Sequence, residues 1–309
     1  MSRTKDFLKL VVVEHSVFAL PFAYLAALTA MRDDWISNAA RFAYRPLNST
    51  TTHPHVRWGD LLLVTIAMVS ARTFAMAANR VIDRELDARN PRTASRELVT
   101  GKVAVSTAVR GAVLALVIFL GTAALLNPLC LMLAPAAVLP LVVYPYAKRF
   151  TNYPQLFLAF AQMVAPVGAA IAITGHWSGR AVILGGAVGT WIGGFDLVYA
   201  CQDVDSDRAE GVGSVPAKHG VKASLRTARI IHVATFGLFV WWGRSEHFGP
   251  LWVAGLIVAA VAFVYQHSIV SPTDLSRANR SFFTTNGFIG IVLFVFGALD
   301  LYVHAGLRP

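Results

Sequence analysis

The chain has 309 residues, of which 56% are hydrophobic and only 14% carry a charged side chain. Soluble globular proteins have about a quarter charged residues, so this composition argues against a soluble enzyme. The net charge of +10 comes without a Lys- or Arg-rich arm. Nucleic acid is therefore a poor candidate partner, and anionic lipid or an anionic substrate is a better one.

Apolar runs of about 20 residues, the length that crosses a bilayer, recur along the whole chain. Nine candidate helices begin close to Val11, Leu61, Val103, Leu129, Leu156, Ala181, Thr227, Leu251 and Phe283. The segment from Met1 to Lys9 is basic, and the apolar stretch that follows ends without a small-residue cleavage signature, so we interpret it as a first helix and not as a removed signal peptide. The sequence predicts an all-α, polytopic membrane protein with about nine transmembrane helices.

The distribution of basic residues predicts the orientation of these helices. Most of the 27 Lys and Arg residues fall on the side of the N-terminus, which the positive-inside rule assigns to the cytoplasm. The expected location is the bacterial inner membrane, with the N-terminus in the cytoplasm. The segment from Arg32 to Arg57 is predicted to be a long loop on the opposite side.

A weak internal repeat divides the chain. Asp83 and Asp87 recur 120 residues later as Asp203 and Asp207, each pair after an apolar helix. We expect one membrane domain of two four-helix halves, roughly 1–150 and 151–270, plus a ninth helix. Such repeats are also common in transporters, so the symmetry alone does not choose a function.

The first acidic motif has an Asn and two Asp residues at every fourth position. Asn79, Asp83 and Asp87 share one helical face, and carboxylates four residues apart call for a cation between them. Oxygen ligands of this kind suit Mg²⁺ together with phosphate oxygens. The alternative is a solvated loop whose arginines pair with the two carboxylates.

The second motif runs from Asp196 to Gly211. Asp196, Asp203 and Asp207 would lie along one stripe if the helix continued, with Asp205 pointing away. Asp196 follows an apolar run and is predicted to lie at membrane depth, where a carboxylate is expensive and usually functional. The same holds for Arg72, which should project onto the face of Asn79 two turns deeper.

Two adjacent cations, Lys148 and Arg149, end the fourth helix on the side of the acidic motifs. They could bind phosphate, Arg in a bidentate manner and Lys as a point charge, or they could be ordinary positive-inside residues. Together with the carboxylates they predict a site for a diphosphate held through divalent metal.

These motifs resemble those of the UbiA superfamily of intramembrane aromatic prenyltransferases. The first motif is similar to the N-D-x-x-D type signature of that family, and the second to its D-x-x-Y-A-x-Q-D-x-x-x-D signature. Further stretches, including Glu14 to Phe22 and Ser281 to Gly287, resemble the MqnP-like or 4-hydroxybenzoate polyprenyltransferase-like bacterial group.

The resemblance implies a central cavity and a set of site residues. It implies two Mg²⁺ ions, one bound by Asn79, Asp83 and Asp87 and the other by Asp203 and Asp207. Diphosphate contacts would come from Arg72, Lys148 and Arg149. Asp196 and Tyr144 would orient the allylic cation and the ring, and Tyr199 and Asn286 would contact substrate.

The expected function is transfer of a polyprenyl group from polyprenyl diphosphate to an aromatic acid in quinone biosynthesis. The resemblance favours a hydroxylated naphthoate of the futalosine menaquinone pathway as the acceptor. The alternatives are 4-hydroxybenzoate, as in ubiquinone synthesis, a transporter of an anionic metabolite, and a lipid-binding scaffold without turnover.

Overall fold

The structure is a computed structural model that describes residues 19–42 and 53–308. Over these residues the fold is helical, with isolated β-bridges and no strand. The long helices are α2 (Leu20–Phe42), α3 (Trp58–Ile82), α5 (Val105–Leu126), α6 (Pro128–Ala147), α7 (Pro154–Thr174), α8 (Gly179–Ala200), α11 (Val221–Ser245), α12 (Pro250–Ser268) and α13 (Asn286–Val303). The short ones are α4 (Arg84–Arg89), η2 (Cys201–Asp203), α9 (Val204–Glu210), α10 (Val215–His219) and the π-helical η3 (Arg280–Thr285).

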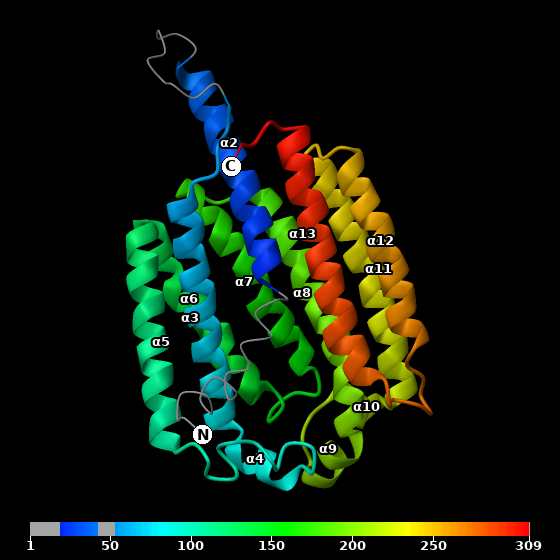
Figure 1. Ribbon diagram of the computed structural model, residues 1–309. Coiled ribbons are helices and arrows are strands. Elements are labelled where there is room, and N and C mark those ends of the chain that lie inside the picture. Colours follow the sequence, from blue (N-terminus) through cyan, green and yellow to red (C-terminus); the bar gives the residue numbers. More distant parts are fainter. Residues whose placement is uncertain (1–18, 43–52, 309) are drawn as a thin grey trace.

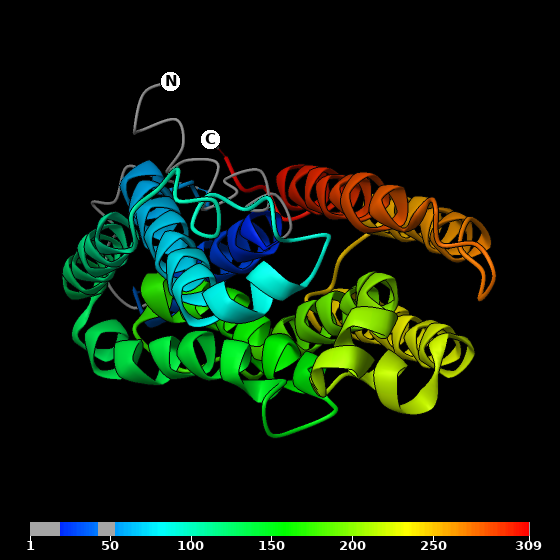
Figure 2. The same ribbon diagram turned by 90° about the horizontal axis from the view of Figure 1, so that it is seen from below.

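The long helices run side by side, and the short helices α4, α9 and α10 gather at one end of the bundle (Figure 1). Viewed from that end, the chain passes around the molecule from the light-blue α3, through the green helices α6, α7 and α8, to the red α13 (Figure 2). Helix α2 packs mainly against α7 and α13, and its side chains form part of the principal apolar core. The short helices lie at one end of the bundle, and residues of α2, α7 and α8 contribute to its principal apolar core.

The composition of the helices supports a multi-pass membrane protein. Seven helical segments of the described chain are long and apolar enough to cross a membrane. Their outward faces are apolar, with side chains such as Leu114 and Val264 exposed. Helices α2 and α11 have the length but carry several charges, so the expected nine crossings stay a prediction for these two. The predicted start of the first helix near Val11 lies outside the described residues.

Local signals explain where several helices begin and end. Asn127 caps α6 by accepting a hydrogen bond from Cys130 N at 2.9 Å, and Pro128 follows at the first helical position. Ser178 caps α8 in the same way, through Ala181 N. Helix α7 ends at Gly175, whose φ of 70° is readily adopted by glycine.

Small residues let α8 approach α7 on one side and α11 on the other. A Cβ atom added to Gly189 would lie 2.5 Å from the backbone oxygen of Ala159, and one on Gly194 would lie 2.5 Å from the ring of His232. Close approach through small residues is typical of helix packing in membranes. The glycines of α8 thus fix the position of the helix that carries the second acidic motif.

The prediction of a loop from Arg32 to Arg57 is wrong in its first part, because α2 continues to Phe42. The charges that suggested a loop are paired inside the fold. Arg32 Nη2 lies 2.5 Å from Glu246 Oε2, and Asp33 pairs with Arg180. These partners lie far away in sequence, so the segment could stay helical at a point where its own residues indicated a helix end.

Candidate active site

The first acidic motif lies where α3 gives way to α4. The helix is interrupted at Asp83, yet the backbone hydrogen bonds keep helical spacing, from Asp83 N to Asn79 O at 2.9 Å and from Asp87 N to Asp83 O at 2.8 Å. Asn79, Asp83 and Asp87 therefore line the same pocket, as the spacing predicted. Asp83 and Asp87 are both buried.

The backbone of the second motif changes from α- to 3₁₀-helix between its carboxylates. Helix α8 ends at Ala200, the 3₁₀ turn η2 follows, and α9 begins at Val204. The single stripe of Asp196, Asp203 and Asp207 was predicted for the case of a continuing helix. With the interposed turn, these three residues line the pocket, whereas Asp205 does not line it.

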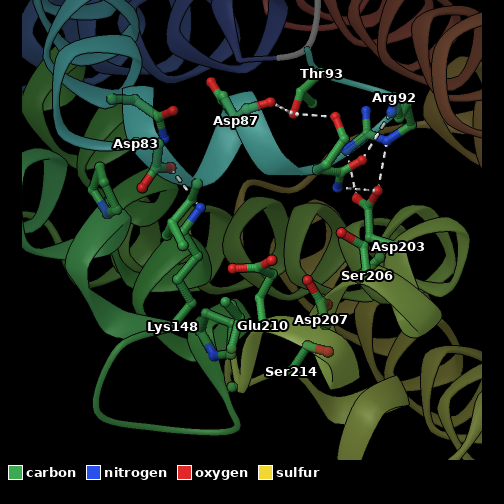
Figure 3. A pocket seen from close by; sticks show the side chains of 18 of the residues that line it. Asp83, Asp87, Arg92, Thr93, Lys148, Asp203, Ser206, Asp207, Glu210 and Ser214 are labelled. Carbon is green, nitrogen blue, oxygen red and sulfur yellow. Dashed lines mark hydrogen bonds and ion pairs between the residues drawn. The ribbon is translucent and has the colours of Figure 1, made fainter.

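The two motifs face each other across this pocket, which has a volume of about 210 Å³. Asp83 and Asp87 lie on the side formed by α4, and Asp203 and Asp207 project from the opposite side, with Ser214 beside Asp207 (Figure 3). The sequence placed these carboxylates at equivalent positions of two helices, and the fold brings them together.

Each of three carboxylates has a basic partner. Lys148 Nζ lies 2.6 Å from Asp83 Oδ2, and Arg96 Nη1 lies 2.5 Å from Asp87 Oδ1. Asp203 accepts hydrogen bonds from Arg92 Nε at 2.8 Å and from Arg92 Nη2. Lys148 was predicted as a site residue.

The sequence analysis gave no site role to three polar residues of the segment after α4, although its alternative of a loop with arginine partners included Arg92. Arg92 and Arg96 bind the motif carboxylates, and Asn90 Nδ2 donates to Asp203 Oδ1 at 2.9 Å. Their only signal in the sequence is their position within a few residues of the first motif. Nothing local in the sequence shows that Arg92 would pair with a carboxylate more than a hundred residues away.

Burial sets the electrostatics of Asp83. Desolvation raises the pKa of its carboxyl group above the ordinary value, while the charge and hydrogen bond of Lys148 act in the opposite direction. One oxygen, Asp83 Oδ1, is buried without a hydrogen-bond partner among the described residues, and Arg149 Nη2 is 3.8 Å from it. This oxygen is available for a further cationic ligand.

A larger apolar cavity of about 580 Å³ adjoins the polar pocket. Five residues line both spaces, namely Asn79, Arg96, Tyr144, Asp196 and Tyr199. The apolar cavity extends between α3, α6 and α7. The arrangement suits a molecule with an anionic head and an apolar tail.

The structure places three other predicted site residues away from the polar pocket. Arg72 lines the apolar cavity, and its Nε is buried without a hydrogen-bond partner in the described chain. Arg149 does not line the pocket, because it donates to Ile82 O and lies over the ring of Tyr146 at 5.0 Å, although its Nη2 is still 3.8 Å from Asp83 Oδ1. Asn286 is fully buried and lines neither space.

The donors of the two motifs suit Mg²⁺ in chemistry, because all are carboxylate or amide oxygens. Among residues 19–42 and 53–308, however, no three Asp, Glu, His or Cys side chains are gathered as one metal-binding group. Asp83, Asp87 and Asp203 are each paired with a basic residue instead. Asp83 Oδ1 has no hydrogen-bond partner among the described residues and only the long ion pair with Arg149 at 3.8 Å.

Fold and pocket together define a multi-pass membrane protein with an acidic site at one end of the bundle. The model of the UbiA prenyltransferase family matches residues 49–290, which is most of the chain. The chain belongs to this family and is an enzyme that transfers prenyl groups.

Curated relatives and solved structures agree with this assignment. The 4-hydroxybenzoate solanesyltransferase of Synechocystis sp. is 33% identical over 235 residues, which are 75% of this chain and 80% of the relative. The 4-hydroxybenzoate octaprenyltransferase of Shewanella woodyi is 29% identical over 243 residues, 79% and 84% of the two chains.

Among solved structures, a UbiA homolog from Aeropyrum pernix K1 matches with a TM-score of 0.78 and 30% identity, covering 94% of this chain and 98% of that one. A UbiA homolog from Archaeoglobus fulgidus bound to GPP and Mg²⁺ matches with a TM-score of 0.67 and 18% identity, covering 96% and 100% of the two chains. The second likeness shows the shared fold.

Proposed function

We propose that the protein transfers a polyprenyl group from polyprenyl diphosphate to a hydroxylated aromatic acid, with 4-hydroxybenzoate as the preferred acceptor. The observation that carries this proposal is the junction of an acidic and basic pocket with a large apolar cavity. The diphosphate would occupy the polar pocket, and the polyprenyl chain the apolar cavity. Relatives named for 4-hydroxybenzoate favour this acceptor over the naphthoate that the sequence resemblance suggested.

In this proposal the polar pocket holds the leaving group. Asn79, Asp83 and Asp87 on one side, and Asp203 and Asp207 on the other, would hold Mg²⁺, which neutralises diphosphate charge when bound. The structure of a homolog bound to GPP and Mg²⁺ supports divalent metal use, and the expected number of two ions stays a prediction. As the carbon–oxygen bond breaks, its electrons leave with the diphosphate, where the cations beside the carboxylates stabilise the growing charge.

Three of those cations are placed for this role. Lys148, Arg92 and Arg96 line the pocket and already contact the motif carboxylates. When the diphosphate is bound, these same side chains can turn their free N–H groups to its oxygens, Arg in a bidentate manner. Arg149, which lies 3.8 Å from Asp83 without lining the pocket, would contribute to the local potential.

The residues at the junction would handle the acceptor. Asp196 and Tyr144 line both spaces, so they face the place where an allylic carbon between pocket and cavity would lie. A carboxylate there stabilises the allylic cation and can take a proton from the acceptor as the ring carbon forms the new bond. The apolar walls exclude water that would otherwise capture the cation.

Arg72 is a better candidate for the acceptor than for the diphosphate. Its guanidinium lies at the apolar cavity, with Nε lacking a partner among the described side chains and backbone. An unpaired buried cation is costly, and a carboxylate offers the bidentate partner that Arg prefers. We therefore assign Arg72 to the carboxylate of the aromatic acid.

The test is a mass-spectrometric assay of the purified protein in lipid discs with Mg²⁺ and geranyl diphosphate or a longer donor. 4-Hydroxybenzoate and dihydroxynaphthoate compete as acceptors. Prenylated 4-hydroxybenzoate as the main product supports the proposal, and prenylated naphthoate would replace its acceptor. No product with either acceptor, with donor bound and intact, would overturn it.

A further inference from the structure

A π-helical turn, η3, precedes α13, and the buried side chain of Asn286 makes two hydrogen bonds to its backbone. Asn286 Nδ2 donates to Ser281 O at 3.1 Å and to Phe282 O at 2.9 Å, while its Oδ1 accepts from Trp191 Nε1 at 2.9 Å. Both Asn286 and Trp191 are fully buried. π-Helical turns are rare and often occur at functional sites.

The turn presents an aromatic side chain to the junction of the two spaces. The ring of Phe282 lies 4.3 Å from that of Tyr199 and 4.9 Å from that of Phe195, measured between centroids. Phe282 lines the apolar cavity, whereas Tyr199 lines both the cavity and the polar pocket. The contacting rings of Phe282 and Tyr199, tilted by 36° to each other, therefore form part of the wall where pocket and cavity meet.

Tyr199 is in turn linked to the second acidic motif. Its hydroxyl accepts a hydrogen bond from Arg92 Nη1 at 2.7 Å, and the guanidinium lies over the ring at 4.9 Å. The same arginine binds Asp203. A chain of direct contacts thus runs from Asn286 through Phe282 and Tyr199 to the charged groups of the pocket.

We propose that Asn286 is a positioning residue that holds the turn η3 so that Phe282 and Tyr199 cover the allylic carbon against water. This inference rests on the proposed function. Once the carbon–oxygen bond to diphosphate has broken, the cation has two fates. Attack by a ring carbon, followed by loss of the ring proton, gives the prenylated acid, while attack by water, followed by loss of a proton, gives the prenyl alcohol.

The position of Asn286 indicates that it supports the turn and does not itself contact the substrate. Substrate contact was expected for Asn286, but its side chain is buried and lines neither the pocket nor the cavity. Its Nδ2 instead donates hydrogen bonds to the backbone of the turn. Its truncation to alanine would remove one side-chain donor from each of the two carbonyl groups, and we expect Phe282 to move away from Tyr199 as a result. Rings at this place can also attract the cation through their π faces.

The experiment measures the ratio of prenyl alcohol to prenylated acceptor at saturating acceptor in lipid discs. Asn286→Ala is expected to raise this ratio about tenfold, the effect of a change in relative barriers of the size of one hydrogen bond. Phe282→Leu should raise it similarly, and the double variant should raise it no further, because both changes remove the same cover.

Trp191→Phe keeps the indole site apolar and removes only one of the three hydrogen bonds, so it serves if Asn286→Ala does not fold. Its ratio should rise by a smaller factor. The matched control is Asp300→Ala, which removes a buried cap at the other end of α13, where Asp300 accepts from Gly249 N and Trp252 N. This variant should lose thermal stability with an unchanged ratio.

The outcomes separate this inference from the proposed function. If the unmodified protein forms products and the Asn286 and Trp191 variants lower both of them together at a constant ratio, Asn286 is merely structural and the inference is overturned. If the unmodified protein forms neither product, the proposed function is wrong, and the inference, which rests on it, is overturned as well.

Discussion

At the scale of single residues, the Asp83–Lys148 pair couples stability to pH. The side chain of Asp83 is 5% exposed and that of Lys148 is 27% exposed. Lys148→Met would leave a buried carboxylate without its closest cation, and we expect the free energy of unfolding at neutral pH to fall by about 1–3 kcal/mol.

The sign of the pH dependence follows from the raised pKa of Asp83. The folded protein holds the Asp83 proton more tightly than the unfolded chain, whose carboxyl titrates near about 3.9. Loss of Lys148 raises the folded pKa further, so the deficit is largest above that pKa and shrinks as the pH falls through it. Thermal unfolding of both proteins in detergent, from about pH 8 to about pH 5, measures this. The double variant with Asp83→Asn should lack the dependence, and a deficit that is independent of pH would contradict the coupling.

Residue-level prediction from sequence succeeded where spacing alone decides the geometry. Asn79, Asp83 and Asp87 reach one pocket because helical hydrogen bonds continue through the break at Asp83. Arg92 and Arg96 could not be predicted in the same way, because their partners depend on how the segment after α4 folds over the site. Residue spacing in the sequence determines which side chains share one face of a helix, whereas tertiary packing determines which residues they contact.

At the scale of elements, the contact between α7 and α8 offers a direct test of why glycine stands in the helix of the second motif. Gly189→Ala would bring a methyl group to 2.5 Å from Ala159 O, so the helices must separate. We expect a loss of about 1–3 kcal/mol in stability and reduced transfer, because α8 carries Asp196 at the junction.

Gly186→Ala is the matched control for this substitution. It lies in the same helix, and its added methyl group would be 3.9 Å from Leu238 Cδ1, an ordinary contact. Its stability should be unchanged or slightly higher, since alanine favours the helix over glycine by about 1 kcal/mol. Equal thermal unfolding of the two variants would show that the close approach is not what requires glycine at position 189.

Elements were predicted well where apolar runs are long and poorly where charges have distant partners. Helices α5, α6, α7 and α12 begin within a few residues of their predicted starts. Helix α2 was predicted to end at Arg32, because a charge after an apolar run usually marks the membrane surface. The partners of the charges in α2 are Glu246, which follows α11, and Arg180 in α8. The sequence around Arg32 cannot indicate partners that lie so far along the chain.

At the scale of the whole molecule, the two ends of the bundle carry charged clusters with different roles. One end holds the acidic motifs and their cations, and the other holds Arg32, Asp33, Arg180 and Glu246. The pairing of two similar halves, roughly 1–150 and 151–270, stays a prediction. It would explain why each half supplies one acidic motif to the pocket.

This division of roles predicts opposite effects of two conservative substitutions. Glu246 is 3% exposed, and burial raises its pKa while Arg32 and Arg180 act against that shift. Glu246→Gln removes the charge that both arginines share and should cost about 3 kcal/mol of stability, because it leaves Arg32 buried with Asp33 as its remaining carboxylate. Transfer per folded molecule should be unchanged, since the cluster lies at the end away from the pocket.

Asp203→Asn should show the reverse pattern. It keeps the shape of the side chain and an oxygen for Asn90 or Arg92, so the protein should unfold at nearly the temperature of the original. Transfer should be abolished, because the amide is a poor substitute for a carboxylate ligand of Mg²⁺. Thermal unfolding and product formation measured on the same preparations of both variants decide the matter. Full activity in Asp203→Asn would contradict the assignment of catalysis to the end of the bundle that holds the acidic motifs. A loss of specific activity in Glu246→Gln at temperatures where this variant is still folded would contradict a purely structural role for the other end.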